Sequence, residues 1–153
     1  MIGDAMATCS FCSQIKDIKA GNPPSDLIAE LPTGYLKLNW FQYYHGYCLF
    51  VSKIHAEDLD ELPRDFADAF MNDMLRCHRA VRVAVEPRKM NVASLGNRDK
   101  HVHWHIIPRH ANDPMPDVPI WELRQSVRQN KAFRITDTSH LNLIEQIRIQ
   151  LMR

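Results

Sequence analysis

The sequence predicts an α+β fold in which an antiparallel sheet packs with one long helix and a C-terminal helix. Short β-rich runs joined by tight turns predict the sheet, and a long run with helical spacing lies between two pairs of these strands. The chain has 153 residues, enough for one hydrophobic core. We therefore expect a single domain over residues 1–153.

The first two predicted strands are residues 35–40 (YLKLNW) and 47–52 (YCLFVS). A turn cluster at 21–24 (GNPP) ends the N-terminal segment, and Gly46 lies in the short connection between the two strands. This pattern is typical of an antiparallel hairpin.

The long helix is predicted to begin after Pro63 and to end before Pro87. Apolar residues recur between these prolines at spacings of three and four, as one face of a helix requires: Phe66, Phe70, Met74, Cys77 and Val81. Two further strands are predicted at 90–95 and 101–108, joined through residues 96–99 (GNRD).

The chain beyond residue 109 carries weaker signals. Three prolines predict an extended surface segment that leads to Trp121: Pro114, Pro116 and Pro119. Residues 140–152 are apolar enough for a packed terminal helix, and three residues are available to cap it: Asp137, Thr138 and Ser139.

The charges of the chain nearly balance, with a net charge of +1. The densest basic stretch, residues 76–82, falls within the long helical pattern and is predicted to be its solvated face, so we expect no nucleic acid polymer as a partner. No apolar run is long enough to span a bilayer, and the N-terminus (MIGDAMATC) lacks the pattern of a signal peptide. We therefore expect a cytoplasmic protein that does not contact a membrane.

The four cysteines fall into two groups. Cys48 and Cys77 lie in apolar patterns and are predicted to be buried thiols. Cys9 and Cys12 form a Cys-x-x-Cys pair, which in a chain without a secretory signal indicates metal or redox chemistry before a structural disulfide.

Residues 101–109 (HVHWHIIPR) place three histidines at every second position. Side chains alternate between the two faces of a strand, so His101, His103 and His105 would share one face, about 6.5–7 Å apart. Val102, Trp104 and Ile106 would face the core: the strand would then be apolar on one side and histidine-lined on the other. Three explanations stay open: structural histidines, a catalytic metal bound by a His-x-His pair and a distant carboxylate, and nucleophilic catalysis by a neutral imidazole.

Residues 101–107 (HVHWHII) resemble the motif of the histidine triad (HIT) family, His-φ-His-φ-His-φ-φ, in which φ is apolar. Residues 9–12 (CSFC) resemble the N-terminal Cys-x-x-Cys of many bacterial members, and residues 46–55 (GYCLFVSKIH) resemble the family's Pro-Gly-His-x-Leu-Val-x-Pro-Lys-x-His segment. Gly96-Asn97 stands where members have Gly-Gln. The resemblance implies a HIT-like fold whose motif-bearing core covers about residues 9–109, with a C-terminal extension over residues 110–153.

The resemblance also implies a nucleotide hydrolase without an organic cofactor. His103 would attack the α-phosphorus of a dinucleoside polyphosphate or another nucleotidyl conjugate, and water would release a nucleoside monophosphate from the covalent nucleotidyl-His103. His105 would hydrogen-bond the phosphate or the leaving oxygen, and His101 would orient the site. Nucleotidyl transferases of the wider fold have glutamine in place of the third histidine, so His105 favours hydrolysis.

Three asparagines match the family's substrate-binding positions. Asn39 would hold the ribose hydroxyls, Asn97 would bind phosphate, and Asn91 would make a similar contact. The alternative for all three is the turn chemistry that asparagine commonly performs.

Two residues depart from the family pattern. Tyr47 stands where many members have a histidine that supports the nucleophile, and a phenol is a poorer base at neutral pH. We expect slower turnover or a shifted leaving-group preference. Ser52 replaces a usual proline, which removes stiffness from the loop without changing the chemistry.

By the same resemblance, Cys9 and Cys12 would bind a structural zinc ion together with His55 and His101. A pair without metal and a redox pair are the alternatives. Members commonly form homodimers, and we expect one here.

The leading function is therefore nucleotide hydrolysis. A nucleotide-binding module with little turnover is the main alternative, favoured by Tyr47. A metalloenzyme built on the His-x-His pair is a third possibility.

Overall fold

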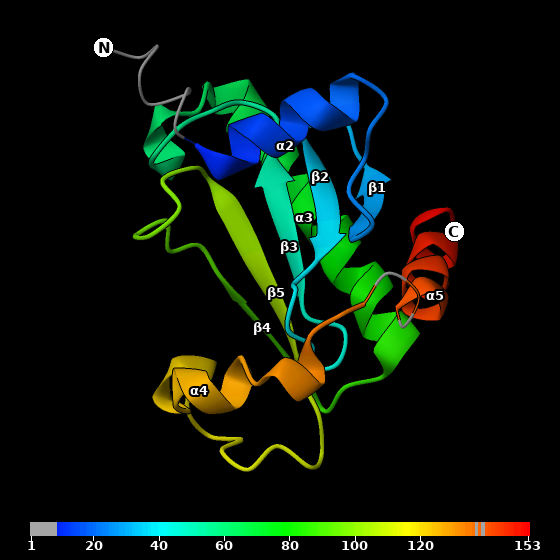
Figure 1. Ribbon diagram of the computed structural model, residues 1–153. Helices are drawn as coiled ribbons and strands as arrows, with labels where there is room; N and C mark the ends of the chain where they lie inside the picture. The colour runs from blue at the N-terminus through cyan, green and yellow to red at the C-terminus, as the bar shows by residue number, and fades with distance from the viewer. Residues whose placement is uncertain (1–8, 137, 139) are drawn as a thin grey trace.

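The computed structural model describes residues 9–136, 138 and 140–153, and a five-stranded antiparallel sheet forms its centre (Figure 1). The strand order is β1-β2-β3-β5-β4, so β1 and β4 are the edge strands. The bounds are β1 Leu27–Glu30, β2 Gly34–Leu38, β3 Cys48–Ser52, β4 Lys89–Ala93 and β5 His103–Arg109.

Both predicted hairpins are confirmed. Strand β2 pairs with β3, and β4 pairs with β5, in antiparallel register. The observed strands begin or end one or two residues away from the predicted bounds. Strand β1, which pairs with β2, was not predicted, because a strand of four residues offers too little alternation to be recognised.

Helix α3 (Arg64–Val85) and helix α5 (Leu141–Leu151) cover one face of the sheet (Figure 1). As predicted, α3 lies between Pro63 and Pro87. It ends at Glu86, which adopts a left-handed conformation with φ of 45°. Pro87 disfavours the right-handed helical conformation in the residue before it. The core between α3, α5 and the sheet contains Leu36, Phe50, Phe70, Cys77, Ile106 and Ile147 among other buried residues.

The opposite face of the sheet is covered by helix α2 (Ser10–Lys19), which lies across β2 and β3 near one end of the sheet (Figure 1). Phe11 and Ile15 of α2 pack with Tyr35 and Val51. Helix α2 was not predicted, although its buried residues Phe11, Cys12 and Ile15 have helical spacing.

The C-terminal extension also packs onto the sheet. It contains the 3-10 turn η2 (Ile120–Glu122), helix α4 (Gln125–Arg128) and the 3-10 turn η3 (Lys131–Phe133) before it reaches α5. A bridge between Phe41 and Arg134 joins this extension to the loop after β2.

The predicted C-terminal helix is observed, but the residues predicted to cap it do not do so. Helix α5 is confirmed, but its N-cap is His140, which makes no capping hydrogen bond through its side chain. Among the predicted caps, Asp137 and Ser139 lie outside the described residues, and Thr138 lies two residues before the N-cap. The basic stretch at 76–82 is confirmed as a solvated face, since its arginines are exposed. Within the described residues, no helix has the length and apolar character required to cross a membrane.

Candidate active site and metal centre

Strand β5 separates the histidines from the core as the alternation predicts. Val102 and Ile106 are buried in the core under α3, and Trp104 packs against that core. The side chains of His103 and His105 therefore lie on the other face, the one that α2 covers. The strand begins at His103 instead of residue 101, so His101 precedes it.

The register of the sheet arranges this face in rows. His103 lies opposite Val51, and Val51 lies opposite Tyr35; in the next row, His105 lies opposite Leu49. The ring of Phe11 from α2 lies 5.1 Å from the His103 ring, measured between centroids. His103 is therefore enclosed by the sheet below and α2 above, with only 4% of its surface exposed.

The hydrogen bonds of His103 define its tautomer. Its Nδ1 atom lies 2.6 Å from the backbone oxygen of His101. A carbonyl only accepts hydrogen bonds, so Nδ1 carries the proton and Nε2 of a neutral ring carries a lone pair. Burial lowers the pKa of His103, which favours this neutral form.

His105 continues the same hydrogen-bonded chain. Its Nε2 atom lies 3.1 Å from Nε2 of His103, and its Nδ1 atom lies 2.7 Å from the Tyr47 hydroxyl. Since His103 Nε2 has a lone pair, the consistent assignment is that His105 donates Nε2–H to it and Tyr47 donates its O–H to His105 Nδ1. Burial and the neighbouring His103 lower the pKa of His105 to about 4.

Tyr47 acts here as a hydrogen-bond donor. Burial raises the pKa of its phenol far above the ordinary value, so the proton stays on the oxygen. The residue that departs from the family pattern therefore still fixes the tautomer of the third histidine.

Four side chains converge at the other end of the triad: Cys9, Cys12, His55 and His101. Cys9 is the N-cap of α2 and Cys12 lies in its first turn, so the helix start brings both sulfurs to one side. His55 follows β3. Their ligand atoms all lie within 4.8 Å of one another, and this group could hold a metal ion.

Four of the six distances between the ligand atoms have the values expected for a tetrahedral site. Nδ1 of His101 lies 3.4 Å from Sγ of Cys9, 3.6 Å from Sγ of Cys12 and 3.3 Å from Nδ1 of His55. Sγ of Cys12 lies 3.3 Å from Nδ1 of His55. Metal–ligand bonds of about 2.0–2.3 Å in a tetrahedron give ligand separations in this range.

His101 joins the metal cluster to the triad. Its Nε2–H donates to the backbone oxygen of Ser52 at 2.8 Å, which leaves the Nδ1 lone pair directed at the cysteines. Its own carbonyl accepts from His103. Ser52 keeps its hydroxyl in the local turn, where it donates to the Ile54 oxygen at 2.9 Å, so the departure from proline leaves the site geometry intact.

The three predicted substrate-binding asparagines lie in different settings. Asn39 Oδ1 accepts from the Phe41 backbone N–H at 3.0 Å, which is turn chemistry. Asn91 lies on β4 opposite Ile107, and its Oδ1 accepts from Arg109 at 2.8 Å. Asn97 is exposed in the loop between β4 and β5 and has no hydrogen bond to the triad within the described part of the chain.

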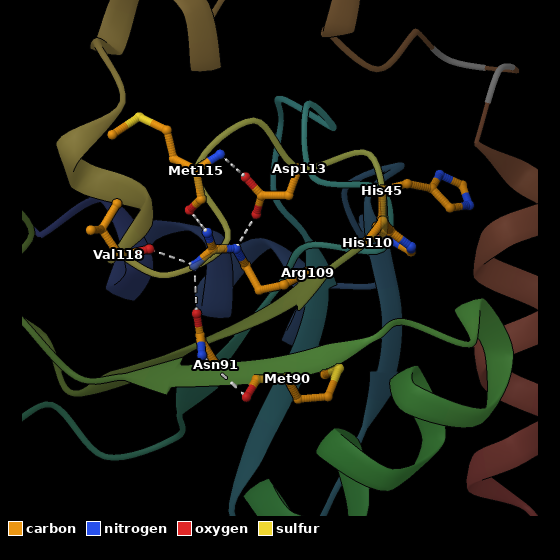
Figure 2. A network of polar contacts seen from close by, with 8 residues as sticks. All are labelled: His45, Met90, Asn91, Arg109, His110, Asp113, Met115 and Val118. Atoms are coloured by element: carbon orange, nitrogen blue, oxygen red, sulfur yellow. Dashed lines mark hydrogen bonds and ion pairs between the residues drawn. The ribbon is translucent and has the colours of Figure 1, made fainter.

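Arg109 was not predicted to have a structural or functional role. Figure 2 shows that its guanidinium lies at the centre of a polar network, and only 4% of the residue is exposed. Its partners are the Asp113 carboxylate, Asn91 Oδ1, and the backbone oxygens of Met115 and Val118. Every residue has a backbone oxygen, so the sequence does not indicate which of them accept hydrogen bonds. The only sequence signal for this network is the arginine that follows Pro108.

Two hollows lie near these residues. A cavity of about 290 Å3 is lined by residues 57–60, residues 94–96 and Val102. Val102 faces the core side of β5, so this cavity is not the triad's own surface. A narrower hollow beside α2 is lined by Phe11, Gln14, Tyr35 and Lys37 among others, and it shares the sheet face of the histidines.

Residues 20–112 match the model of the HIT domain family. Since this match covers more than half of the chain, the protein belongs to the HIT family, and both the predicted family and the predicted fold class are confirmed.

Particular relatives give the family match more detail. The chain is 30% identical over 109 residues to "Protein hit" of Bacillus subtilis, covering 67% of this chain and 72% of that protein. It is 27% identical over 104 residues to adenosine 5'-monophosphoramidase HNT1 of Saccharomyces cerevisiae, covering 67% and 63%. The structure of a Zn-bound histidine triad family protein from Mycobacterium smegmatis has the same fold, with a TM-score of 0.68 and 20% identity over 96% of this chain and 95% of that one.

Proposed function

We propose that the protein hydrolyses a nucleotidyl conjugate and releases a nucleoside monophosphate through a covalent intermediate on His103. The observation that carries this proposal is the 2.6 Å hydrogen bond from His103 Nδ1 to the His101 carbonyl, because it leaves the Nε2 lone pair for attack. The relatives named adenosine 5'-monophosphoramidase support a nucleotide substrate.

The reaction proceeds in two displacements. His103 Nε2 attacks the α-phosphorus, an N–P bond forms, and the bond to the leaving group breaks with its electron pair remaining on that group. Water then adds to phosphorus and breaks the N–P bond, and the proton that it releases balances the proton taken up by the leaving group. His105 donates its Nε2–H to the leaving oxygen or nitrogen during the first step.

The contacts to the other parts of the substrate are proposed from the positions of the three asparagines and of His101. Asn39 contacts the ribose and Asn97 a phosphate oxygen, while Asn91 acts through its bond to Arg109. His101 orients His103 through its carbonyl.

A structural zinc ion is proposed at Cys9, Cys12, His55 and His101. The two-sulfur, two-nitrogen donor set and the ligand separations of 3.3–3.6 Å fit zinc. Burial and the neighbouring Cys9 raise the pKa of Cys12 to about 11, so a bound cation is what would hold it as the thiolate. When bound, zinc would fix His101 and, through its carbonyl, the tautomer of His103.

The observations favour hydrolysis over the two alternatives. Four protein ligands leave no open position on the metal for catalysis, and His103 and His105 are outside the cluster. The Tyr47 hydrogen bond to His105 weakens the case for a binding module without turnover, since it maintains the triad.

We also propose that two chains pair. Strand β4 is an edge strand, and its Val92 is 42% exposed. An edge strand with an exposed apolar side chain is a template for pairing with a second copy. A molar mass of one chain by light scattering at micromolar concentration would contradict the dimer.

The function is tested by measuring AMP release from diadenosine triphosphate, diadenosine tetraphosphate and adenosine phosphoramidate. The wild-type protein is expected to release AMP from at least one of them, and His103→Ala is expected to release none. Tight nucleotide binding without AMP release by the wild type would favour the binding module instead.

A further inference from the structure

The cavity of about 290 Å3 beside Val102 has no part in the proposed reaction. It is lined by residues 57–60, residues 94–96 and Val102, whose side chain belongs to the core and points away from the face of His103. We propose that this cavity is a second binding site, which takes a small organic cation made of an ammonium group on an apolar stem. The inference goes beyond the proposed function and does not depend on it.

The cavity forms where three strand ends meet. Strand β3 ends at Ser52, β4 ends at Ala93 and β5 begins at His103, and antiparallel pairing brings these three points to the same end of the sheet. The loops that leave β3 and β4 approach each other beyond the sheet, since a Cβ on Gly96 would lie 3.5 Å from the backbone oxygen of Glu57. The cavity therefore lies between two loops that contact each other.

Backbone hydrogen bonds hold the buried side of the cavity in place. The N–H of Val102 donates to the Ala56 oxygen at 2.8 Å, and the Val102 oxygen accepts from the N–H of Ser52 at 3.1 Å. The N–H of Glu57 donates to the Glu61 carboxylate at 2.9 Å. The lining is therefore formed before a ligand binds, so binding costs little ordering entropy.

Two leucines from separate segments supply the apolar part of the lining. Leu59 is 40% exposed and Leu95 is 49% exposed, and both line the cavity. A single exposed leucine is ordinary, but two that converge on one hollow provide a surface for an alkyl or aryl stem. The volume lies just below the range typical of sites for drug-sized ligands, so a small molecule fits better than a peptide.

The charged part of the lining is acidic. The carboxylates of Glu57, Asp58 and Asp60 line the cavity, and none of its described lining residues is basic. Glu57 is paired with the exposed Lys100 at 3.3 Å. Asp58 and Asp60 have no ion pair or hydrogen bond through their side chains within the described residues. Two unpaired negative charges beside an apolar surface complement a cation with an apolar stem and repel an anion such as a nucleotide.

The test titrates isotopically labelled full-length protein with hexylamine, hexanol and hexanoate, followed by the NMR shifts of the backbone amides. The three probes share one alkyl chain and differ in charge at neutral pH. We expect saturable shifts at residues 57–60 and 94–96, a Kd for hexylamine about fivefold lower than that for hexanol, and no binding of hexanoate. Added salt is expected to weaken the binding of hexylamine and to leave that of hexanol unchanged.

Two pairs of substitutions separate the cavity from the overall charge of the protein. The double variant with Asp58→Asn and Asp60→Asn is expected to raise the Kd for hexylamine about fivefold and to leave the Kd for hexanol unchanged. The double variant with Asp68→Asn and Asp117→Asn removes two exposed carboxylates outside the cavity and is the matched control, which should bind hexylamine as the wild type does.

A third variant tests the apolar stem. Leu95→Ala removes an exposed side chain from the lining and is expected to weaken the binding of both hexylamine and hexanol. Three results would overturn the inference: no saturable shift with hexylamine, shifts centred outside the cavity, or equal Kd values for hexylamine and hexanol. Equal losses in the two double variants would do the same. None of these results concerns AMP release, so the failure of this inference is distinguishable from the failure of the proposed function.

Discussion

The two ends of the histidine strand are held in different ways. At the N-terminal end, His101 meets two cysteines and His55 in a cluster with the donor set and spacing of a metal site. At the C-terminal end, Arg109 meets one carboxylate, one amide oxygen and two backbone oxygens. The proposed zinc ion would complete the first end, whereas the contacts of the second end all come from the polypeptide itself.

The two ends of the strand should therefore differ in whether their structure depends on a bound metal ion. His101, a member of the cluster, fixes the tautomer of His103 through its carbonyl, so under the proposed function the geometry at His103 would depend on metal supply. The Arg109 network holds the C-terminal extension against His105 and is independent of metal. Substitutions that disrupt only one of the two ends should therefore have distinguishable effects on the free energy of unfolding, the metal content and the reaction rate.

The largest effect is expected from Arg109→Ala. The substitution leaves the buried Asp113 carboxylate without its cation and removes the bonds to Asn91, Met115 and Val118. We expect the free energy of unfolding in urea to fall by about 3–5 kcal/mol. Lys100→Ala, which removes an exposed pair with Glu57, should cost less than about 1 kcal/mol. Equal effects of the two variants would show that the Arg109 end does not hold the fold.

Metal removal is expected to have the next largest effect. Cys12→Ser should lower the zinc content measured by mass spectrometry and remove the stabilisation by bound metal, about 3 kcal/mol when free zinc is near one hundred times its Kd. Cys77→Ala alters a core thiol that has no part in the cluster and should keep the zinc. An unchanged zinc content in Cys12→Ser would contradict the assignment of the cluster.

A smaller effect is expected from a matched pair of tyrosine variants. Tyr47→Phe removes the donor to His105 Nδ1 and should lower kcat about tenfold, equivalent to about 1.4 kcal/mol, with little loss of stability. The buried Tyr44 hydroxyl has no hydrogen-bond partner within the described residues, so Tyr44→Phe should be neutral or slightly stabilising. If both variants keep full activity, Tyr47 does not set the tautomer of His105.

The smallest effect is expected from pH. The folded pKa of His105, lowered to about 4, lies below the value of about 6.5 in an unfolded chain. Between these values the unfolded chain binds a proton that the folded chain does not, so the stability is fully present above about pH 6.5 and declines as pH falls toward 4. Urea unfolding at pH 7, 6 and 5 should show this decline, and His105→Asn should show less of it. The same decline in both proteins would assign it to other groups.

The predictability of the two ends follows from the nature of their contacts. The spacing of the histidines, with apolar residues between them, is sufficient to predict which face each side chain takes, and the structure confirms the core side of Val102 and Ile106. The metal ligands come from three separate segments, and only the resemblance to the HIT family brought Cys9, Cys12 and His55 together before the fold was known.

The parts that were not predicted depend on short elements and backbone partners. Strand β1 has only four residues, and helix α2 has only ten, of which three are buried. The partners of Arg109 include carbonyl groups of Met115 and Val118, whose side chains carry no information about the contact. The contact between Trp121 and His105 requires the path of the whole extension.

The nucleophile is the central claim, and the most direct measurement is mass spectrometry of protein quenched during turnover of a nucleotidyl conjugate. We expect a covalent nucleoside monophosphate on the peptide that contains His103, and we expect both this adduct and AMP release to be absent in His103→Ala. A His103→Ala protein that still releases AMP, or an adduct on a different residue, would show that His103 is not the nucleophile.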